Sequence, residues 1–145
     1  MTSIEALYEI ADEHGIDIHE FEFDDIISMS APSNIAIDKS KVEGIVEMID
    51  VLSHELGHCV TGSFYNAKNI LDVYEKQEYK ANMWKLKKLL PLDEYVKAIA
   101  QGITDIRHLA YEYDLCYDFA QKAAEYYNNN YDIEKLVDDY KKTIE

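Results

Sequence analysis

The segment His54-Glu55-Leu56-Gly57-His58 constrains this chain more strongly than any other part of it. Two histidines that are four residues apart project from the same face of an α-helix, so both imidazoles can reach one metal ion. Apolar residues recur around them at helical spacing, between about residues 42 and 62. These apolar residues are Ile45, Ile49, Leu52 and Leu56. The sequence therefore predicts an amphipathic helix that carries a pair of metal ligands.

The glutamate inside this segment adds a chemical role. Glu55 stands beside the first histidine, where a carboxylate can take a proton from water at the metal without binding the metal itself. The pattern H-E-x-x-H is the signature of zinc-dependent peptidases. The competing interpretation is a surface helix with two solvated histidines. We predict that His54 and His58 bind Zn²⁺ and that Glu55 is the catalytic carboxylate.

The composition favours one domain and argues against a nucleic-acid partner. The chain has 145 residues and a net charge of −15, from 29 acidic and 14 basic residues. Binding to a phosphate backbone needs clustered lysine and arginine. Residues 104–127 have a spacing that superficially suits a helix–turn–helix, but Arg107 and Lys122 are their only basic residues. We therefore expect no direct contact with nucleic acid, whereas a basic protein partner remains open.

Three features of the sequence bear on location. Residues 1–13 are acidic and lack the apolar run behind a basic start that marks a secretory signal. No segment approaches the length and apolarity needed to span a bilayer. Cys59 and Cys116 do not form a C-x-x-C pair, and they suit free thiols in a reducing compartment. We expect a cytoplasmic protein with no membrane contact.

Hydrophobic periodicity predicts an α+β fold with a short antiparallel or mixed sheet packed on the motif helix. The first helix should run to about His14, capped by Thr2 or Ser3 and ended by Gly15. Strands are expected at residues 16–18, 21–23, 26–29 and 34–38, with a break at His19-Glu20 and a turn at Pro32-Ser33. Further helices are expected at about 42–62, 71–90, 92–103, 105–113, 117–127 and 133–144, with Asn128-Asn129-Asn130 as a turn.

Catalytic zinc usually takes three protein ligands, so a third must lie elsewhere in the chain. The metzincin pattern would need a glycine three residues after His58 and a histidine six residues after it. Those positions hold Thr61 and Phe64, so that arrangement is absent. The remaining histidines have no motif around them and are expected to be structural or solvated. They are His14, His19 and His108.

A glutamate on the next predicted helix is the other common solution. Glu75 and Glu78 both qualify, because they are three residues apart on one helical face. Glu78 follows His58 by twenty residues, the spacing of thermolysin-like enzymes, so we favour it over Glu75. Asn82 stands four residues later, where its amide can accept a hydrogen bond from a ligand imidazole and fix its tautomer. Glu75 is expected either to support the ligands without binding the metal or to be solvated.

A second window resembles a known family. The stretch Glu78-Tyr79-Lys80-Ala81-Asn82-Met83-Trp84, which ends at Leu89-Leu90-Pro91, resembles the ImmA/IrrE family of zinc metallopeptidases. In that family the third ligand opens an E-x-x-A-N-x-aromatic stretch that closes in L-L-x-P or a near variant. The leader Asp50-Val51-Leu52-Ser53 into the histidine motif is similar too. The resemblance covers about residues 16–127, although Trp84-Lys85 stands where Phe-Ala is usual.

This resemblance implies a single zincin-like metallopeptidase domain over residues 1–145, with about residues 92–145 as a helical C-terminal subregion. It implies His54, His58 and Glu78 as ligands of Zn²⁺ and Glu55 as the catalytic carboxylate of a gluzincin-like endopeptidase. Characterised members are associated with cleavage of helix–turn–helix transcriptional repressors of prophages and mobile elements, which relieves repression. The expected partner is therefore such a repressor, acting as a protein substrate. The alternative is a non-catalytic zinc-containing anti-repressor that inactivates a repressor by binding it.

Two parts of the predicted mechanism are left open by the sequence. A hydrogen-bond donor must stabilise the oxyanion of the transition state, and Tyr65, Tyr74, Tyr79 or His108 could supply it. A sheet edge beside the metal helix pairs with the substrate backbone in zincins, and residues 34–38 are the candidate edge. An ordinary core strand is at least as good an interpretation of that segment.

Overall fold

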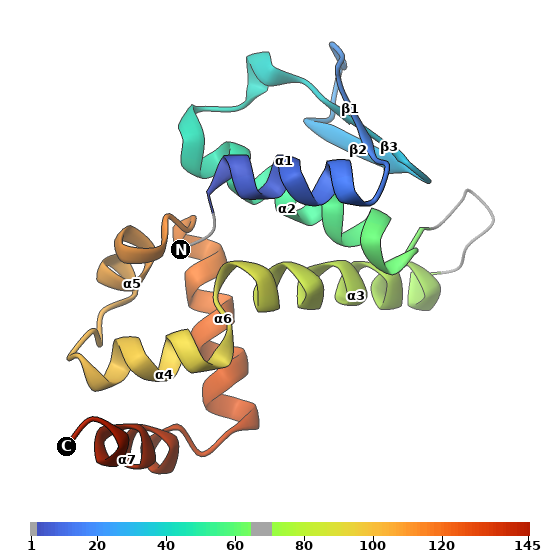
Figure 1. The fold of residues 1–145 in the computed structure, drawn as a ribbon. Helices are drawn as coiled ribbons and strands as arrows, with labels where there is room; N and C mark the ends of the chain where they lie inside the picture. The colour runs from blue at the N-terminus through green and yellow to red at the C-terminus, as the bar shows by residue number, and fades with distance from the viewer. Residues whose placement is uncertain (1–2, 65–70) are drawn as a thin grey trace. The chain divides into compact units, whose positions relative to one another are not determined.

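The computed structural model describes residues 3–64 and 71–145. These described residues form an α+β structure with seven α-helices and one three-stranded mixed sheet (Figure 1). The chain divides into two compact units, Thr2–Lys85 and Leu86–Glu145. The first unit contains the sheet and the histidine motif, and the second is helical. The boundary lies within helix α3, shortly before residue 92, where the helical subregion is predicted to begin.

The first helix forms where the sequence predicts it. Helix α1 (Ile4–Glu13) begins after Ser3, whose hydroxyl accepts a hydrogen bond from the Ala6 N–H at 3.2 Å. Gly15 has a positive φ of 65°, which lets the chain turn out of the helix. Leu7 and Ala11 are buried and anchor the helix in the core of the first unit.

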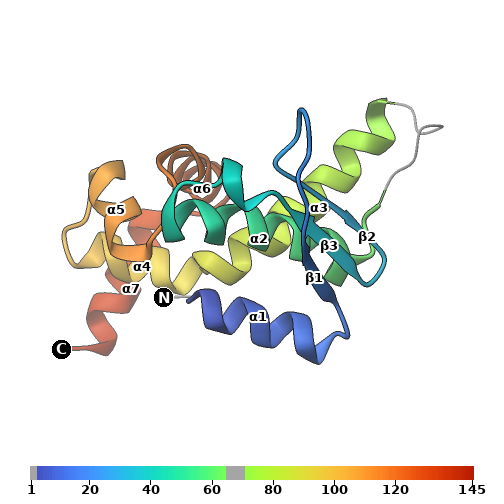
Figure 2. The same cartoon turned by 90° about the horizontal axis from the view of Figure 1, so that it is seen from above.

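The sheet has the order β1-β3-β2, so β3 is central (Figure 2). Strand β1 (Asp17–Glu20) pairs with β3 (Asn34–Ile37) in parallel, and β2 (Ser28–Ala31) pairs with β3 antiparallel. Ile35 and Ile37 of β3 are buried, as their alternation predicts. Helix α2 packs against β2 and β3 as well as α1. The motif helix therefore rests on the sheet.

The prediction of a strand at residues 21–23 is wrong, and so is the break at His19-Glu20, which lies inside β1. The last backbone hydrogen bond that continues the pairing of β1 with β3 runs from the Phe21 N–H to the Ile37 carbonyl. Strand β3 ends at Ile37, so it offers no partner to the residues that follow Phe21. Side chains satisfy the backbone that follows. The Phe23 N–H donates to the Asp38 carboxylate at 3.0 Å, and the Lys41 ammonium donates to carbonyls of the loop.

Asp38 and Lys41 together hold the loop that leads into β2. Lys41 binds the carbonyl oxygens of Phe23, Asp24 and Ile26 and forms an ion pair with Asp38. Hydrogen bonds from the Ser40 hydroxyl and from the Phe23 N–H, with Lys41 adding to them, lower the pKa of Asp38 to about 2. The Asp38 carboxylate therefore stays ionised at neutral pH, and it fixes the approach of this loop to the strand.

Two long helices of the first unit carry the sequence motifs. Helix α2 (Gly44–Thr61) follows a short 3-10 turn (Lys39–Lys41), and helix α3 (Leu71–Leu89) runs up to Leu90 and Pro91. Residues later in α2 contact residues earlier in α3, so the two helices are antiparallel. Lys85 is buried and its ammonium lies 2.6 Å from the Asp50 carboxylate. Lys85 thus links α3 to the motif helix.

Gly57 lies where α2 and α3 approach each other closely. A Cβ atom at this position would stand 2.5 Å from the Ala81 carbonyl oxygen, which is shorter than any normal contact. Ala81 itself is fully buried. Of the two roles that Gly57 could have, close backbone approach or simple weakening of the helix, the structure supports the first.

The second unit consists of α4 (Leu92–Ala100), α5 (Ile106–Tyr113), α6 (Tyr117–Asn130) and α7 (Ile133–Thr143). Helix α4 packs against α7, and α5 packs against α6. The rings of Tyr95 and Tyr127 stack, and the Tyr127 hydroxyl donates to the Leu90 carbonyl at 2.6 Å. Burial raises the pKa of Tyr127 to about 12. No helix in the described part of the chain is long and apolar enough to cross a membrane.

The turn predicted at Asn128-Asn129-Asn130 is wrong, because α6 continues through these residues. The Asn128 side chain accepts a hydrogen bond from the Tyr95 hydroxyl, and the Asn130 amide donates to the Tyr126 carbonyl one turn earlier. Tertiary contact and local hydrogen bonding thus override the low helix propensity of asparagine.

We predict that Gly57→Ala lowers the free energy of unfolding by about 1–3 kcal/mol, because the added methyl group would collide with the Ala81 backbone. Chemical denaturation of the metal-free protein measures this change. Without the collision the same substitution would stabilise the helix by up to about 1 kcal/mol, since alanine is the better helix former. A stabilised variant would therefore contradict the close approach of α2 and α3.

Candidate metal centre

Three of the predicted site residues meet at one point in the first unit. His54 and His58 lie one turn apart on α2, and Glu78 reaches them from α3. One oxygen of the Glu78 carboxylate lies 3.0 Å from His54 Nε2, and the other lies 3.0 Å from His58 Nε2. Their candidate ligand atoms all fall within 4.8 Å of one another. The group is therefore close enough to bind one metal ion.

The Nδ1 atom of His58 is held by the backbone. It lies 2.6 Å from the Ser63 carbonyl oxygen, which can only accept, so Nδ1 must carry the hydrogen. The turn that brings Ser63 back depends on Gly62, which ends α2 with a φ of 65°. His58 and Ser63 are both buried. The C-terminal turn of the motif helix thus selects the tautomer in which Nε2 can bind a metal.

The Nδ1 atom of His54 is held by α3. It lies 2.9 Å from the Asn82 amide oxygen, which also accepts. Asn82 stands one turn after Glu78, so a single face of α3 both orients one imidazole and presents the carboxylate. This is the contact predicted for Asn82 from its position in the sequence.

The Nε2 atoms and the carboxylate are arranged so that a cation could lie between them. With Nδ1 of each ring directed to a backbone or amide oxygen, each Nε2 faces a Glu78 oxygen at 3.0 Å. In this arrangement each Nε2 can either donate to Glu78 or bind a metal ion together with it. Atoms that each lie about 2.0–2.1 Å from one zinc ion can be at most about 4.2 Å apart. The 3.0 Å contacts meet this limit, whereas the widest separation, up to 4.8 Å, would have to shorten when a metal binds. The donor set of two imidazoles and one carboxylate suits a divalent transition metal.

Glu55 lies beside this group and does not belong to it. Its side chain is 5 % exposed, and one carboxylate oxygen accepts a hydrogen bond from the Ser30 hydroxyl of β2 at 3.0 Å. Ser30 thus fixes the rotamer of Glu55, and the second carboxylate oxygen is left for other partners. A carboxylate held beside a metal group in this way can exchange protons with water or substrate.

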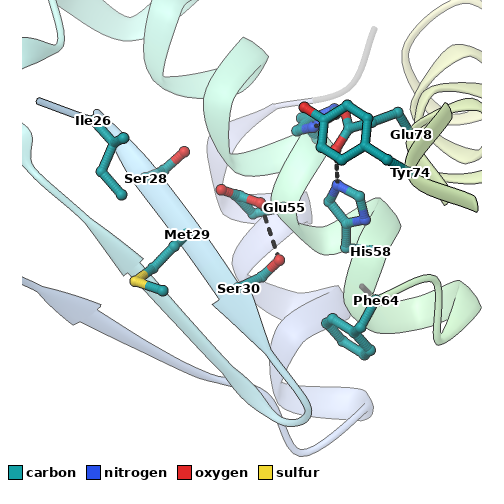
Figure 3. A pocket seen from close by; sticks show the side chains of 10 residues that line it. Ile26, Ser28, Met29, Ser30, Glu55, His58, Phe64, Tyr74 and Glu78 are labelled. Atoms are coloured by element: carbon teal, nitrogen blue, oxygen red, sulfur yellow. Dashed lines mark hydrogen bonds and ion pairs between the residues drawn. The ribbon is translucent and has the colours of Figure 1, made fainter. Parts of the chain in front are cut away.

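A cavity of about 490 Å³ opens onto these residues (Figure 3). Its polar part contains His54, His58, Glu78 and Glu55, and β2 forms the facing wall. The remaining lining residues are Ile26, Ser28, Met29, Ser30, Phe64 and Tyr74. This volume lies within the range of about 300–1,000 Å³ that is typical of ligand sites.

The edge of the sheet at the cavity is β2, so the prediction of residues 34–38 as a substrate edge is wrong. Strand β3 is hydrogen-bonded to β1 on one side and to β2 on the other, which leaves it no free edge. The Asp38 N–H donates to the Ile27 carbonyl, so the alternating antiparallel pattern turns the backbone groups of Ser28 and Ser30 away from β3. Within the described residues those groups have no strand partner.

The other predicted site residues are distributed as follows. Tyr74 lines the cavity, whereas Tyr79 is 58 % exposed and does not. Glu75 is exposed and stays outside the metal group. His108 belongs to the second unit, and Tyr65 lies outside the described residues.

Cys59, next to a candidate ligand, is half-buried. Its thiol approaches the Ala31 carbonyl oxygen at 3.5 Å. Burial, with the nearby Glu55 charge, raises the pKa of Cys59 to about 11. The thiol therefore stays protonated at neutral pH, which disfavours it as a ligand.

Sequence reasoning missed several residues that complete the site. Ser30 and the Ser63 carbonyl orient Glu55 and His58, and neither belongs to a motif. The sequence offered one indication of the role of Ser30. Two serines alternate with Met29 on β2, and alternate residues of a strand share one face, so both serines face the same side.

Comparisons with family models, curated proteins and solved structures give no significant match to this chain. The chemistry of the site must therefore be inferred from its own residues.

We predict that Asn82→Ala weakens zinc binding by about 10–100-fold, because His54 loses the acceptor that orients it. Competition with a chromogenic chelator measures the affinity. Glu75→Ala is the matched control on the same helix and should bind zinc as the unmodified protein does. Equal affinities for the two variants would rule out a role for Asn82 in holding the metal centre.

Proposed function

We propose that this chain is a zinc-dependent endopeptidase with a zincin-like fold. The observation that carries the proposal is the placement of the Glu55 carboxylate, which is buried and hydrogen-bonded, beside the His54, His58 and Glu78 group at the wall of an open cavity. Two imidazoles and a carboxylate are a usual ligand set for catalytic zinc, and they leave a position for water or substrate.

In the proposed hydrolysis each residue of the site has a separate role. Zinc, when bound, supplies Lewis acidity that activates water and polarises the substrate carbonyl. The Glu55 oxygen that does not bind Ser30 accepts a proton from the attacking water and passes it to the leaving amine. Ser30 keeps Glu55 from rotating towards the ligands. His58 and His54 stay oriented through Ser63 and Asn82.

Tyr74 is the residue that we assign as oxyanion donor. Its side chain lines the cavity from α3, one turn before Glu78 (Figure 3). Among the four candidates it is the one that lines the cavity in the described structure. A phenol hydroxyl can donate a hydrogen bond to developing negative charge.

The substrate backbone is assigned to the open edge of β2. Ser28 and Ser30 direct their backbone N–H and carbonyl groups to that edge, at the cavity wall. An extended peptide can pair with such an edge as an additional strand. A substrate paired in this way would have one of its peptide bonds beside the metal group and Glu55.

The biological target belongs to the same proposal and rests on the resemblance to the ImmA/IrrE family. We propose that the substrate is a helix–turn–helix repressor of a prophage or mobile element and that cleavage relieves repression. The strongly acidic chain suits a protein target better than nucleic acid.

The proposal predicts that Glu55→Gln abolishes peptide-bond hydrolysis while zinc binding persists, because the amide cannot accept the proton. The assay follows cleavage of the repressor encoded beside the gene, and of unfolded casein, by mass spectrometry with and without a chelator. Glu75→Gln is the control and should remain active. Full derepression by Glu55→Gln would instead establish the non-catalytic anti-repressor.

The same assay tests Tyr74 with a matched pair of variants. Tyr74→Phe should reduce kcat by about 10²-fold with zinc affinity unchanged, since one donor to the oxyanion is lost. Tyr79→Phe, on the same helix and outside the cavity, should keep the original rate. Equal rates for the two variants would remove Tyr74 from the mechanism without affecting the peptidase assignment.

A further inference from the structure

We propose that the outer face of the sheet, which is turned away from α2, docks a basic protein surface that carries exposed apolar side chains. This inference goes beyond the proposed peptidase function, because the outer face lies across the sheet from Glu55 and the metal group. It follows from the side chains that the strand register places on this face, from their exposure and from the charges around them.

The strand register assigns each residue of the sheet to one of its two faces. The Ser30 hydroxyl binds Glu55 of α2, so Ser30 lies on the inner face. In the next row of the sheet, Met29 pairs with Ala36, and Ala36 pairs with His19. Because successive residues of a strand point to opposite faces, this row lies on the outer face. Figure 3 shows the Met29 side chain on the side of β2 away from Glu55.

Large apolar side chains are exposed on the outer face. Met29 is 50 % exposed. Phe21, whose N–H extends the pairing of β1 with β3, follows His19 by two residues and therefore shares its face, and it is 59 % exposed. The rings of Phe21 and Phe23 lie in contact, with centroids 4.8 Å apart. Exposed aromatic rings and methionine on one face are typical of protein interfaces.

The described helices of the first unit leave this face uncovered. Helices α1 and α2 pack on each other, and the inner-face residues Ile35 and Ile37 are buried. On the outer face, His19, Met29 and Ala31 are exposed. The apolar side chains of the outer face are therefore accessible to a partner.

Acidic residues surround the apolar side chains of the outer face. Asp17 lies on this face of β1, two residues before His19, and Glu22 stands between the two phenylalanines. Asp24 and Asp25 follow at the end of the sheet where β1 ends and β2 begins. All four acidic residues are exposed, and none forms an ion pair within the described part of the chain.

The two lysines that follow β3 do not compensate these charges. Lys39 forms an ion pair with Glu20 at 2.7 Å. Lys41 directs its ammonium to carbonyls of the loop and to Asp38. The outer face therefore presents negative charge around an apolar centre, which favours the approach of a positively charged partner.

The same charges argue against a second copy of this chain as the occupant. In a symmetric dimer built on this face, Asp17 and Glu22 of both copies would meet at one interface. Like charges brought together in this way oppose association. Nucleic acid and anionic lipid would be repelled for the same reason. A protein surface on which lysine or arginine flanks apolar residues matches both the charge and the exposed side chains.

An NMR titration of the ¹⁵N-labelled full chain tests the inference. The probes are three short synthetic peptides, which alternate leucine with lysine, serine with lysine, or leucine with glutamate. The leucine–lysine peptide should bind at least about tenfold more tightly than the other two, because only it can bury apolar surface and match the charge. Its largest amide shifts are expected at His19, Phe21, Met29 and Ala36.

Three results would overturn the inference. They are equal binding of the three peptides, shifts that centre on the residues around the metal group, and a concentration-dependent dimer of the chain that Met29→Ser abolishes. None of these readouts requires hydrolysis, so each of them would leave the peptidase assignment intact.

A matched pair of charge variants separates the outer face from the general acidity of the chain. Asp17→Asn combined with Glu22→Gln should weaken binding of the leucine–lysine peptide at least about fivefold, since two charges beside the apolar centre are lost. Asp12→Asn combined with Glu9→Gln removes the same charge from exposed positions of α1 and should leave the affinity unchanged. Equal weakening by the two pairs would overturn the assignment of this face.

A second pair of variants tests the apolar side chains. Met29→Ser should weaken binding of the leucine–lysine peptide about tenfold, because its side chain is no longer available for burial. Ile45→Ser, which changes an exposed apolar residue of α2, is the control and should bind as the unmodified protein does. Phe21→Ser provides the same test if Met29→Ser unfolds. Unchanged binding in both Met29→Ser and Phe21→Ser would contradict the proposal.

Discussion

The close approach of α2 and α3 at Gly57 is the constraint on which the candidate site depends. Because Gly57 has no side chain, the Ala81 carbonyl can come where a methyl group would otherwise stand. That approach brings Glu78 and Asn82, on either side of Ala81, within reach of the two histidines on either side of Gly57. The partly buried ion pair between Lys85 and Asp50 holds the next turn of the same contact. A single small residue thus sets the distance between two ligand-bearing helices.

Once the helices are in contact, hydrogen bonds outside the metal group determine what the group can bind. Ser63 and Asn82 accept hydrogen bonds from Nδ1 of the two rings, so that both Nε2 atoms face the Glu78 carboxylate. Such an arrangement suits a cation bound between them. The sheet adds Ser30, which holds the one carboxylate of the cavity that is not in the group. In the proposed mechanism the metal ligands come from helices α2 and α3, whereas the proton-transfer carboxylate is held by α2 and the sheet.

The sequence predicted the parts of the site that depend on local periodicity. The histidine helix, the glutamate helix and the spacing of Glu78 and Asn82 follow from a period of 3.6 residues, and the structure brings His54, His58, Glu78 and Asn82 together. The order of the strands in the sheet does not follow from local sequence pattern. The alternation at residues 34–38 predicts a strand, but it does not tell whether that strand lies at the edge or in the centre of the sheet. This strand is central, because residues distant in sequence pair with it on both sides. Phe21–Phe23 alternate as well, yet Asp38 and Lys41 bind their backbone. Ser30 meets Glu55 across 25 residues of sequence, a contact that no spacing rule predicts.

X-ray absorption spectroscopy at the zinc edge, on protein loaded with one equivalent of zinc, tests most directly whether His54, His58 and Glu78 form one metal centre. The account predicts nitrogen and oxygen ligands at about 2.0–2.1 Å, with two imidazoles and no sulfur. It also predicts that one imidazole disappears from the spectrum in His58→Ala. A sulfur ligand at about 2.3 Å, or a zinc environment that His58→Ala leaves unchanged, would contradict it.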